Sequence, residues 1–555
     1  MSDKLLRKPI DKIILSSVAY DTQRDYLFIG CRFATLLVYS MSDNQNEPIA
    51  IFKNFFKGDT ISSIEPLNES QECTLYLTDR DGSYHLIKIN EELEYEFLQS
   101  SRIQKGFLEG IIRLSNGDTI FYGFKSDSFF AWNETKQYEI MREICGGPHR
   151  RWMFKHWIDK TSKNLKYRFV YTRASEVQII EIGDSYAVEL LAAGLHGREI
   201  RDICWIDAVN DKNEKVVITG AEDTTLKIGT LKSNGEYTLH WTYREHVAGL
   251  QSIHPVNSEY IMSSSALEEL FLWKITEADG KKCMALHGSL PPSEENPDLR
   301  IMNFDTIEIV DSEKNLVGFL LVSAYSNSAI KVFQYTYSTK KFTLLIDDYY
   351  MKCCIFHAKF LSLNGKLYIL IGSTNGHITL YNVQTNIEDR YITLDVEVCG
   401  KVRLQEKTPT ADPKPAKLGK WTINQQMHQS SIKALELIQV SPDKVTVLTG
   451  GDDNALIVSK LQSVEGTEVV TVDVKSFNPS AASSTITTIK AVDQNTVLVG
   501  AVDQSLRLWD IGSDLKLVED NYTTVADTGC AEIVDFGDDK KLALVGGSGF
   551  SIIKI

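Results

Sequence analysis

The feature that most constrains this chain is a repeated unit of two short strands joined by a tight polar turn. Runs of β-branched and aromatic residues alternate with turns rich in Gly, Asn, Asp and Ser. The unit recurs roughly every 35–50 residues, the spacing of propeller blades. Its clearest copies are Tyr26–Tyr39, Thr74–Ile89, Thr119–Trp132, Lys215–Thr230, Tyr260–Trp273, Gly318–Phe333, Leu367–Tyr381, Thr446–Lys460 and Thr496–Asp510.

These hairpins predict an all-β fold built from β-propeller blades. One hairpin cannot bury both of its faces, whereas radial packing of blades buries them and leaves only short edges. About ten or eleven hairpins exceed one ring of seven blades and fall short of two. We therefore expect three to four blades of a partial propeller in residues 1–143 and a seven-bladed propeller in residues 144–555. The first part would be completed by further residues, completed by a partner, or closed as a small ring.

A Pro- and Lys-rich stretch at residues 401–421 breaks the repeat. It lies between strands, so we expect a mobile surface insertion there. A solvated loop is the simpler interpretation of its lysines, and RNA contact is the alternative.

Composition limits the possible partners. The net charge of −15 disfavours phosphate backbones, so nucleic acid would have to bind a local basic patch. The start of the chain lacks the apolar run of a signal peptide, and no stretch is apolar enough to span a membrane. Nine scattered cysteines without framework spacing suggest reduced thiols. We expect a cytoplasmic protein without membrane contact.

Several His–Asp spacings match the pattern of WD repeats. His196 precedes Asp223, and His428 precedes Asp453, by the interval at which a WD-repeat His bonds to a turn Asp. Asp503 lies in the turn before the Trp509–Asp510 pair. A buried Asp that accepts turn N–H bonds satisfies donors that would otherwise be costly to bury. We therefore assign structural roles to His196, Asp223, His428, Asp453 and Asp503.

Longer strings are similar to one WD-repeat family. They are CGGPHRRWMF at 145–154, HGREIRDICW at 196–205, TGAEDTTLKI at 219–228, EHVAGL at 245–250 and HQSSIKALEL at 428–437. Together they resemble the C-terminal half of the WD-repeat accessory subunit of the tRNA wobble-nucleotide ribose 2′-O-methyltransferase. The resemblance covers about residues 145–460, and the chain lacks that family's N-terminal propeller. It implies that the catalytic methyltransferase is a separate partner subunit.

A basic segment at residues 145–173 provides a candidate binding surface. It holds eight Lys or Arg residues and one acid, with aromatic residues interleaved. Cations neutralise phosphates, and aromatic rings can stack on unpaired bases. In the simpler alternative the aromatics fill a blade core and the cations form its wet side. The residues we assign to RNA or partner binding are Arg150, Arg151, Trp152, Lys155 and Lys166, together with Arg198 and Arg201.

The sequence offers little sign of catalysis. The Gly-rich string GGSGF at 546–550 is not followed by a helix, as a cofactor-binding turn would require. The grouping of Cys145, His149 and His156 matches no common metal site. We expect no catalytic residues, no cofactor and no metal. The preferred function is a non-catalytic scaffold that binds the tRNA methyltransferase and positions tRNA for wobble methylation. The alternative is a general protein-interaction adaptor, in trafficking or ubiquitin ligation, without RNA contact.

Overall fold

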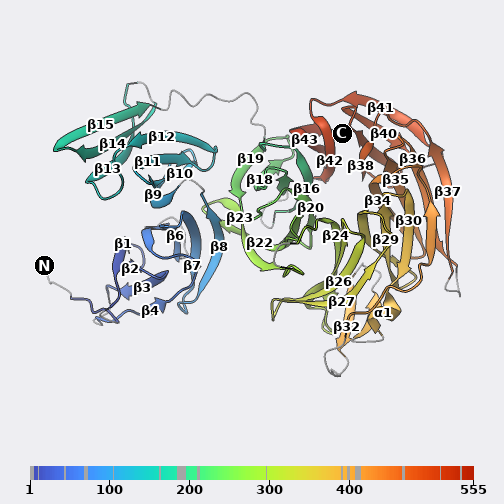
Figure 1. Ribbon diagram of the computed structural model, residues 1–555, viewed down its shortest axis with the longest axis horizontal. Coiled ribbons are helices and arrows are strands. Elements are labelled where there is room, and N and C mark those ends of the chain that lie inside the picture. The colour runs from blue at the N-terminus through green and yellow to red at the C-terminus, as the bar shows by residue number, and fades with distance from the viewer. Residues whose placement is uncertain are drawn as a thin grey trace. The chain divides into compact units, whose positions relative to one another are not determined.

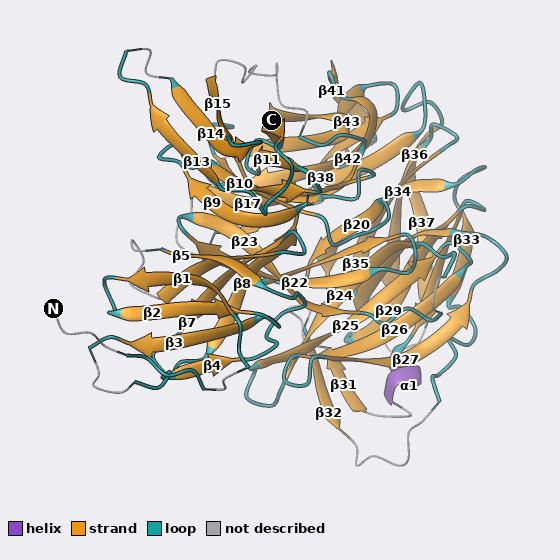
Figure 2. Ribbon diagram, turned by 60° about the vertical axis from the view of Figure 1, so that its left-hand side comes forward, coloured by secondary structure: helices purple, strands orange, loops and turns teal. Residues whose placement is uncertain are grey.

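A computed structural model describes most of the 555 residues. The residues outside the description are 1–4, 10–11, 43–45, 68–72, 104–105, 162–163, 184–194, 209–212, 295–296, 389–391, 397–400, 407–413, 465–468, 513 and 538–539. The described residues form β-strands almost throughout, apart from turns and one short helix, α1 (Gln384–Glu388) (Figure 2). The predicted all-β fold of WD-repeat propeller blades is confirmed.

The chain forms two compact units. Unit 1 comprises Met1–Ala193 together with two later segments, Leu239–Glu245 and Ile275–Ala285. Unit 2 comprises Gly194–Thr238, His246–Lys274 and Leu286–Ile555. The grouping therefore differs from the expected boundary after residue 143, because residues 144–183 and both later segments belong to unit 1.

Unit 1 contains three four-stranded antiparallel sheets and one three-stranded sheet. The first two are β1 (Leu15–Asp21), β2 (Tyr26–Cys31), β3 (Thr35–Ser40) and β4 (Ala50–Phe52), then β5 (Ile61–Pro66), β6 (Cys73–Asp79), β7 (Ser83–Ile89) and β8 (Tyr95–Arg102). The others are β9 (Phe107–Arg113), β10 (Thr119–Lys125), β11 (Ser128–Asn133) and β12 (Tyr138–Ile144), then β13 (Trp152–Ile158), β14 (Leu165–Arg173) and β15 (Glu176–Gly183).

These four sheets follow one another in an arc. One apolar cluster joins β1–β4 to β5–β8, and a second joins β9–β12 to β13–β15. Between the middle sheets Tyr84 stacks on Phe121, with ring centroids 4.3 Å apart. Figure 1 shows the β1–β4 and β13–β15 sheets at the two ends of this arc.

The two later segments fill the interior of unit 1. Trp241 is fully buried beside Tyr76 and Tyr84. The Tyr243 hydroxyl accepts a hydrogen bond from the Met284 N–H at 2.6 Å. Burial of such large rings contributes several kcal/mol, so unit 1 needs residues from beyond position 238. Hydrophobic periodicity could not predict that these segments belong to unit 1, because it shows that a residue is buried but not which part of the chain covers it.

Seven further sheets lie among the described residues of 200–554. They make up unit 2, except that strands of the first two sheets also include the two later segments of unit 1. The first sheet consists of β16 (Ile200–Asp207), β17 (Glu214–Ala221), β18 (Leu226–Lys232) and β19 (Tyr237–Tyr243), and the second of β20 (Leu250–Pro255), β21 (Tyr260–Ser265), β22 (Leu270–Ala278) and β23 (Lys281–Ser289). The third consists of β24 (Ile301–Val310), β25 (Leu316–Tyr325), β26 (Ala329–Thr336) and β27 (Lys341–Tyr349), and is extended by β31 (Ile392–Val396) and β32 (Val402–Glu406). The fourth and fifth are β28 (Ile355–Leu363), β29 (Lys366–Ser373), β30 (His377–Asn382), β33 (Ile423–Gln426); and β34 (Ile432–Ser441), β35 (Lys444–Gly451), β36 (Leu456–Ser463), β37 (Val470–Asn478). The last two are β38 (Ile486–Ala491), β39 (Thr496–Ala501), β40 (Ser505–Asp510), β41 (Lys516–Tyr522); and β42 (Ala526–Asp535), β43 (Lys541–Lys554).

The sheets of unit 2 close into a ring (Figure 1). The first strand of each sheet contacts the first strand of the next, and β42 of the last sheet contacts β16 of the first. At this junction the Trp205 indole N–H donates to the Ile533 carbonyl at 2.8 Å. Seven sheets from residues 200–554 thus complete a propeller without the β13–β15 sheet.

The second strands show why these sequences form blades. They are near-continuous apolar runs because neighbouring blades cover both faces of the sheet. Glycines occur where blades approach most closely. A Cβ at Gly450 would lie 2.4 Å from the Ile486 side chain, and one at Gly220 would lie 2.7 Å from Ile253.

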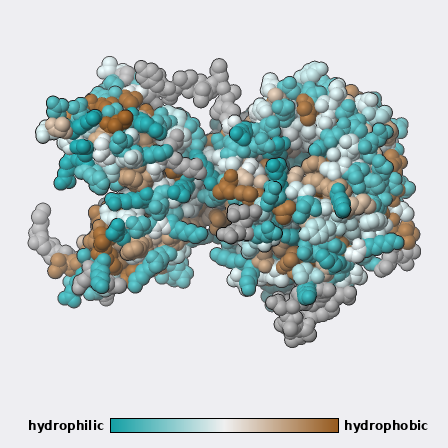
Figure 3. Space-filling model, viewed as in Figure 1, coloured by the Kyte–Doolittle hydropathy of each residue, from teal (hydrophilic) through white to brown (hydrophobic). Residues whose placement is uncertain are grey.

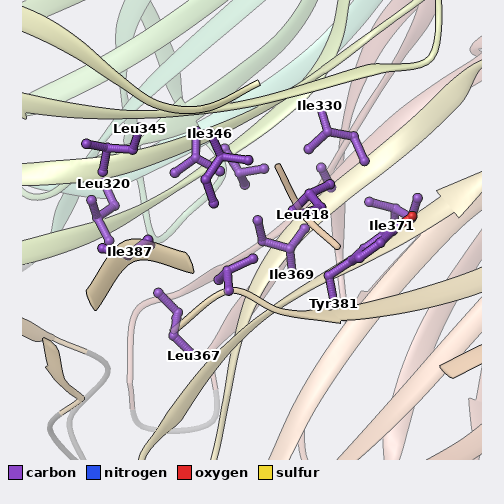
Figure 4. Packing of buried hydrophobic residues seen from close by; sticks show 14 of the residues in the cluster. Leu320, Ile330, Leu345, Ile346, Leu367, Ile369, Ile371, Tyr381, Ile387 and Leu418 are labelled. Carbon is purple, nitrogen blue, oxygen red and sulfur yellow. The ribbon is translucent and has the colours of Figure 1, made fainter. Parts of the chain in front are cut away.

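The Pro- and Lys-rich stretch is anchored on both sides, which corrects the expectation of a mobile surface insertion for its described part. Strand β32 pairs in parallel with the end of β24, through Ile309 and Val310. After residues 407–413, which lie outside the description, Ala416 and Leu418 are buried in a core cluster. Figure 4 shows Leu418 among Ile330, Ile371 and other residues of that cluster. The polar composition of the stretch concealed these two anchors.

Candidate functional site

The basic segment forms the loop before β13 and the strands β13 and β14. Its sheet has two different faces because side chains alternate along a strand. One face, with Phe154, Tyr167 and Phe169, packs against the β9–β12 sheet. Phe169 stacks on Phe129 with centroids 3.9 Å apart. Most of the aromatic residues of the segment therefore fill a blade core.

Arg150 and Arg151 lie in the loop that precedes β13 and are exposed. This loop follows Gly146 and Gly147, which both have positive φ. A Cβ at Gly146 would lie 2.4 Å from Nε of Arg150, so the Gly-Gly turn lets the guanidinium lie against the backbone. The turn thus holds one of the two predicted arginines at the surface.

The outer face of the sheet carries the remaining cations. Lys155 is exposed and is paired in register with Arg168 on the adjacent strand. Lys166 is half-buried, and its Nζ lies 2.7 Å from Asp159. Arg168 forms an ion pair with Glu181 and lies over the Trp157 ring, 4.9 Å from its centroid. Carboxylates therefore offset part of the charge that the sequence shows here.

Trp152 does not form an open stacking platform. Its ring is partly buried and meets Phe124 edge-on at 5.2 Å. The ring already has protein neighbours, so a base could stack on it only after displacing them. Of the predicted residues in this segment, Arg150, Arg151 and Lys155 are the most accessible.

Arg198 and Arg201 belong to unit 2. Arg198 is exposed in the turn before β16. Arg201 is exposed on β16 and donates from Nε to Glu222 at 3.0 Å, with Glu199 also within ion-pair distance. The seven residues assigned to binding are thus distributed over both units.

His196 and Asp223 form one of the turn networks that the spacing predicts. His196 Nδ1 lies 3.2 Å from an Asp223 carboxylate oxygen, and Nε2 lies 2.8 Å from the Thr219 hydroxyl. The carboxylate also accepts the backbone N–H groups of Gly197 and Thr225. Burial alone would raise the pKa of Asp223, but the bonds from His196 and the turn hold it below its usual value. Burial lowers the pKa of His196, which keeps its ring neutral.

His428 and Asp453 repeat this arrangement in the β34–β37 sheet. His428 Nδ1 donates to Asp453 at 2.8 Å, and its Nε2 lies 2.9 Å from Thr449. Asp503 occupies the same kind of turn, where the backbone N–H of Ser483 donates to it at 2.9 Å. No His partner of Asp503 occurs among the bonds of the described residues, and Arg507 pairs with it instead.

A further network does not follow from the His–Asp spacing because Glu replaces Asp in it. His246 Nδ1 lies 2.9 Å from Glu269, and its Nε2 lies 2.7 Å from the Ser263 hydroxyl. The Trp273 indole donates to the same hydroxyl at 2.8 Å. The sheet β20–β23 therefore holds a His–Ser–Trp set. The signal was His246 followed 23 residues later by a carboxylate.

Within the described ranges, no three His, Cys, Asp or Glu residues are grouped so that they could hold a metal ion. Cys145 is buried, and its thiol faces the Asp127 carbonyl at 3.6 Å. Among helices in the described part of the chain, none is long and apolar enough to cross a membrane.

Comparison with known proteins supports the resemblance seen in the motifs. The chain is 20% identical over 515 residues to the tRNA (34-2'-O)-methyltransferase regulator WDR6 of Homo sapiens, covering 79% of this chain and 44% of that protein. It is 21% identical over 540 residues to the protein of the same name from Rattus norvegicus, and this match covers 82% of this chain and 46% of that protein. The protein of Pongo abelii matches like the human one. No family model matches the chain.

Five curated relatives share this name, and the chain spans less than half of their length. The similarity is distant but covers about four-fifths of the chain. It agrees with the WD-repeat type of fold that the structure shows. The relatives are named as regulators and not as enzymes.

Proposed function

We propose that this chain is a non-catalytic subunit that binds a tRNA 2′-O-methyltransferase in the cytoplasm and positions tRNA for methylation of the wobble nucleotide. The observation that carries the proposal is the shared name of the relatives over about four-fifths of the chain. Asp223 and Glu269 hold turns together through bonds to His side chains and, for Asp223, to turn N–H groups, and such fold-holding roles fit a scaffold.

The scaffold would act by positioning. Holding the ribose hydroxyl near the methyl donor of the partner removes much of the entropic cost of their encounter. Arg150, Arg151 and Lys155 are accessible cations that could neutralise phosphates of the tRNA backbone. Arg198 supplies a further exposed cation in unit 2.

One observation favours the alternative, an adaptor that contacts only proteins. Lys166 and Arg201 are each paired with a carboxylate, which leaves them less free for phosphates. In the adaptor interpretation, Arg150 and Arg151 would bind an acidic protein surface.

Reconstitution tests the proposal. The chain is mixed with a purified tRNA 2′-O-methyltransferase, S-adenosylmethionine and tRNA, and methylation of nucleotide 34 is followed with each component omitted. We expect no methylation by the chain alone and a higher kcat/KM when it joins the methyltransferase. An unchanged rate, without formation of a complex, would refute the proposal. A complex whose tRNA affinity equals that of the methyltransferase alone would favour the adaptor.

A further inference from the structure

The turns that join second to third strands differ between the two units. In unit 1 a cation enters each of the four turns: Arg32 before β3, Arg80 before β7, Lys125 before β11 and Arg173 before β15. No Lys or Arg occupies the matching positions of unit 2, which are residues 221–225, 265–269, 325–328, 373–376, 451–455 and 501–504, all of them described. A cation at every such turn is therefore a property of unit 1 and not of blades in general.

The loops that join successive sheets of unit 1 carry further cations. Together with the cations of the turns they number nine, and every one of these nine residues is exposed. We call them the cation row: Arg32, Lys53, Lys57, Arg80, Arg102, Lys125, Arg150, Arg151 and Arg173. The described residues of the same turns and loops contain three acids, Asp59, Asp81 and Asp127. The row is thus positively charged in a chain whose net charge is −15.

Backbone contacts join these turns and loops into one continuous edge of unit 1. The loop before β9 touches the next turn at Gly106, where a Cβ would lie 3.0 Å from the Cβ of Lys125. The other steps are N–H to carbonyl hydrogen bonds, which run from Ala34 to Asp59 at 2.9 Å, from Arg80 to Thr60 at 3.3 Å, from Ile103 to Gly82 at 2.8 Å, from Gly146 to Asp127 at 2.8 Å and from Thr172 to Arg151 at 3.0 Å. The nine cations therefore follow one another along a single edge.

Carboxylates offset little of this charge. Two ion pairs within the described part of the chain involve the row, and both are loose. Arg32 Nε lies 3.9 Å from Asp59, and Arg80 Nη2 lies 4.0 Å from Glu109. Exposed pairs of this kind contribute little free energy. A phosphate can therefore replace either carboxylate at small cost.

Phe33 adds an open aromatic ring to the first turn. It is 68% exposed and directly follows Arg32. Phe33 and Ala34 have φ angles of 58° and 43°, a turn conformation that favours Asn and Gly. A bulky residue in this conformation costs stability and gains little burial here, and such outliers cluster at functional sites. The exposed ring is suited to stack on an unpaired base.

We propose that the cation row and Phe33 form a tRNA-binding edge of unit 1, with phosphates along the row and an unpaired base on Phe33. Packed sheets lie about 10 Å apart, so the four turns span roughly 30 Å, which suits a polynucleotide and exceeds a single phosphate. Six of the nine cations are Arg, whose planar guanidinium matches phosphate oxygens. The choice of tRNA rests on the proposed function. The edge extends the candidate surface from Arg150 and Arg151 to all four sheets.

An acidic protein surface is the competing occupant, and two observations favour RNA. The cations recur on every sheet of unit 1, which matches a ligand that carries a charge at regular intervals along its length. The ring of Phe33 lies open beside Arg32, and stacking of bases on aromatic rings is a general feature of single-stranded RNA binding. Carboxylates of a protein need no such ring.

The outer face of the β13–β15 sheet is a poorer phosphate surface than this edge. Val177 and Ile179 are 63% and 62% exposed on β15. Figure 3 shows hydrophobic residues gathered over this end of unit 1. Apolar side chains offer no charge to phosphates, so we place the RNA along the turns and loops and not across the sheet.

A salt titration of tRNA binding tests this inference. The full chain, without methyltransferase, is mixed with a labelled tRNA transcript, and affinity is measured by fluorescence anisotropy. R173Q removes one cation of the row, whereas K160Q removes one from the turn at the other end of the same sheet. We expect R173Q to lower the slope of log affinity against log salt by about 0.7–0.9, and R32Q/K125Q/R173Q by about three times as much. K160Q should leave the slope unchanged, and all variants should melt like the parent because the residues are exposed.

Substitution of Phe33 tests the stacked base. F33A should weaken tRNA binding at least about fivefold with the salt slope unchanged, because it removes a ring and no charge. F33W should keep the affinity of the parent. A blunt RNA duplex without unpaired bases should bind F33A and the parent equally.

Three results would overturn the proposal. They are a parent chain that does not bind tRNA, a slope for R173Q equal to that of the parent, and equal effects of R173Q and K160Q. Polyglutamate that displaces tRNA as well as competitor RNA does would assign the edge to an acidic protein instead. A pulldown of the methyltransferase separates this test from that of the proposed function, because a failed pulldown with intact tRNA binding refutes only the proposed function.

Discussion

Arg244 and Glu134 are 110 residues apart in the sequence and form an ion pair inside unit 1, with Nη1 2.8 Å from Oε1. Glu134 is fully buried, and it also accepts hydrogen bonds from the Trp132 indole at 2.8 Å and the Tyr84 hydroxyl at 3.2 Å. The pair joins the first part of the chain to the segment Leu239–Glu245. The ion pair therefore holds a segment that follows the first 193 residues in the sequence inside unit 1.

Removing one partner of this pair should destabilise unit 1. E134L removes the carboxylate bonded to the buried Arg244 guanidinium and leaves Glu245 as a nearby carboxyl. We expect the free energy of unfolding to fall by about 3–5 kcal/mol. Denaturant unfolding followed by fluorescence measures it. The double variant E134L/R244M should lose less than the sum of the two single changes. Additive losses would show that the two side chains act independently.

Substitution of the turn carboxylates should cost stability and not a specific activity. D223A or D453A leaves turn N–H groups and a His without an acceptor, so we expect a loss of about 1–3 kcal/mol. Thermal melting measures it, with D473A on the exposed outer strand of the same propeller as a control. A variant that melts like the parent but no longer supports methylation would instead assign the residue to function.

The stability of unit 2 should depend on pH through His357. Burial lowers its pKa to about 4, and its Nε2 donates to the Lys433 carbonyl at 2.9 Å. Above about pH 6.5 the ring is neutral in both folded and unfolded chains, so it adds no pH dependence there. As the pH falls from about 6.5 towards 4 the unfolded chain takes up the proton first, and stability declines by about 1–3 kcal/mol. H357Q should flatten this slope in unfolding titrations between pH 4 and 8. An unchanged slope would mean that other groups set it.

Charge reversal in the basic segment should weaken tRNA binding by the complex. R150E, R151E and K155E alter exposed side chains, so the fold should survive. Each lost phosphate contact should lower the slope of log affinity against log salt by about 0.7–0.9. A salt titration measures it, with K516E on β41 as the control. Equal slopes for parent and variant would place these arginines on a solvated edge or a protein interface.

The sequence predicted the strands better than the assembly of the sheets. Alternating hydrophobicity and turn residues revealed the hairpins, since these are local signals. The spacing of His428 and Asp453 also anticipated a hydrogen bond that the structure contains. Contacts between residues that are far apart in the sequence have no comparable pattern in the sequence. Trp241 reads as part of a later blade, yet it is buried in unit 1 beside Tyr76.

The candidate surface was predicted only in part. Counting charges identified the basic segment, but it could not show that Asp159 lies beside Lys166 or that Glu181 on the next strand lies beside Arg168. The interleaved aromatics alternate into the core as a strand requires, which removes Trp152 as an open platform. The bond between His246 and Glu269 was not predicted, because Glu occupies the turn position where the repeat pattern has Asp.

The bond from Trp205 to Ile533 has a consequence for biosynthesis. The two residues are 328 positions apart, so the strand β16 emerges from the ribosome long before the strand that covers it. Until then its apolar side chains have a neighbour on one side only, and contacts of such sequence separation form slowly. We expect nascent chains that stop before residue 526 to associate with chaperones, and release to coincide with synthesis of β42 and β43.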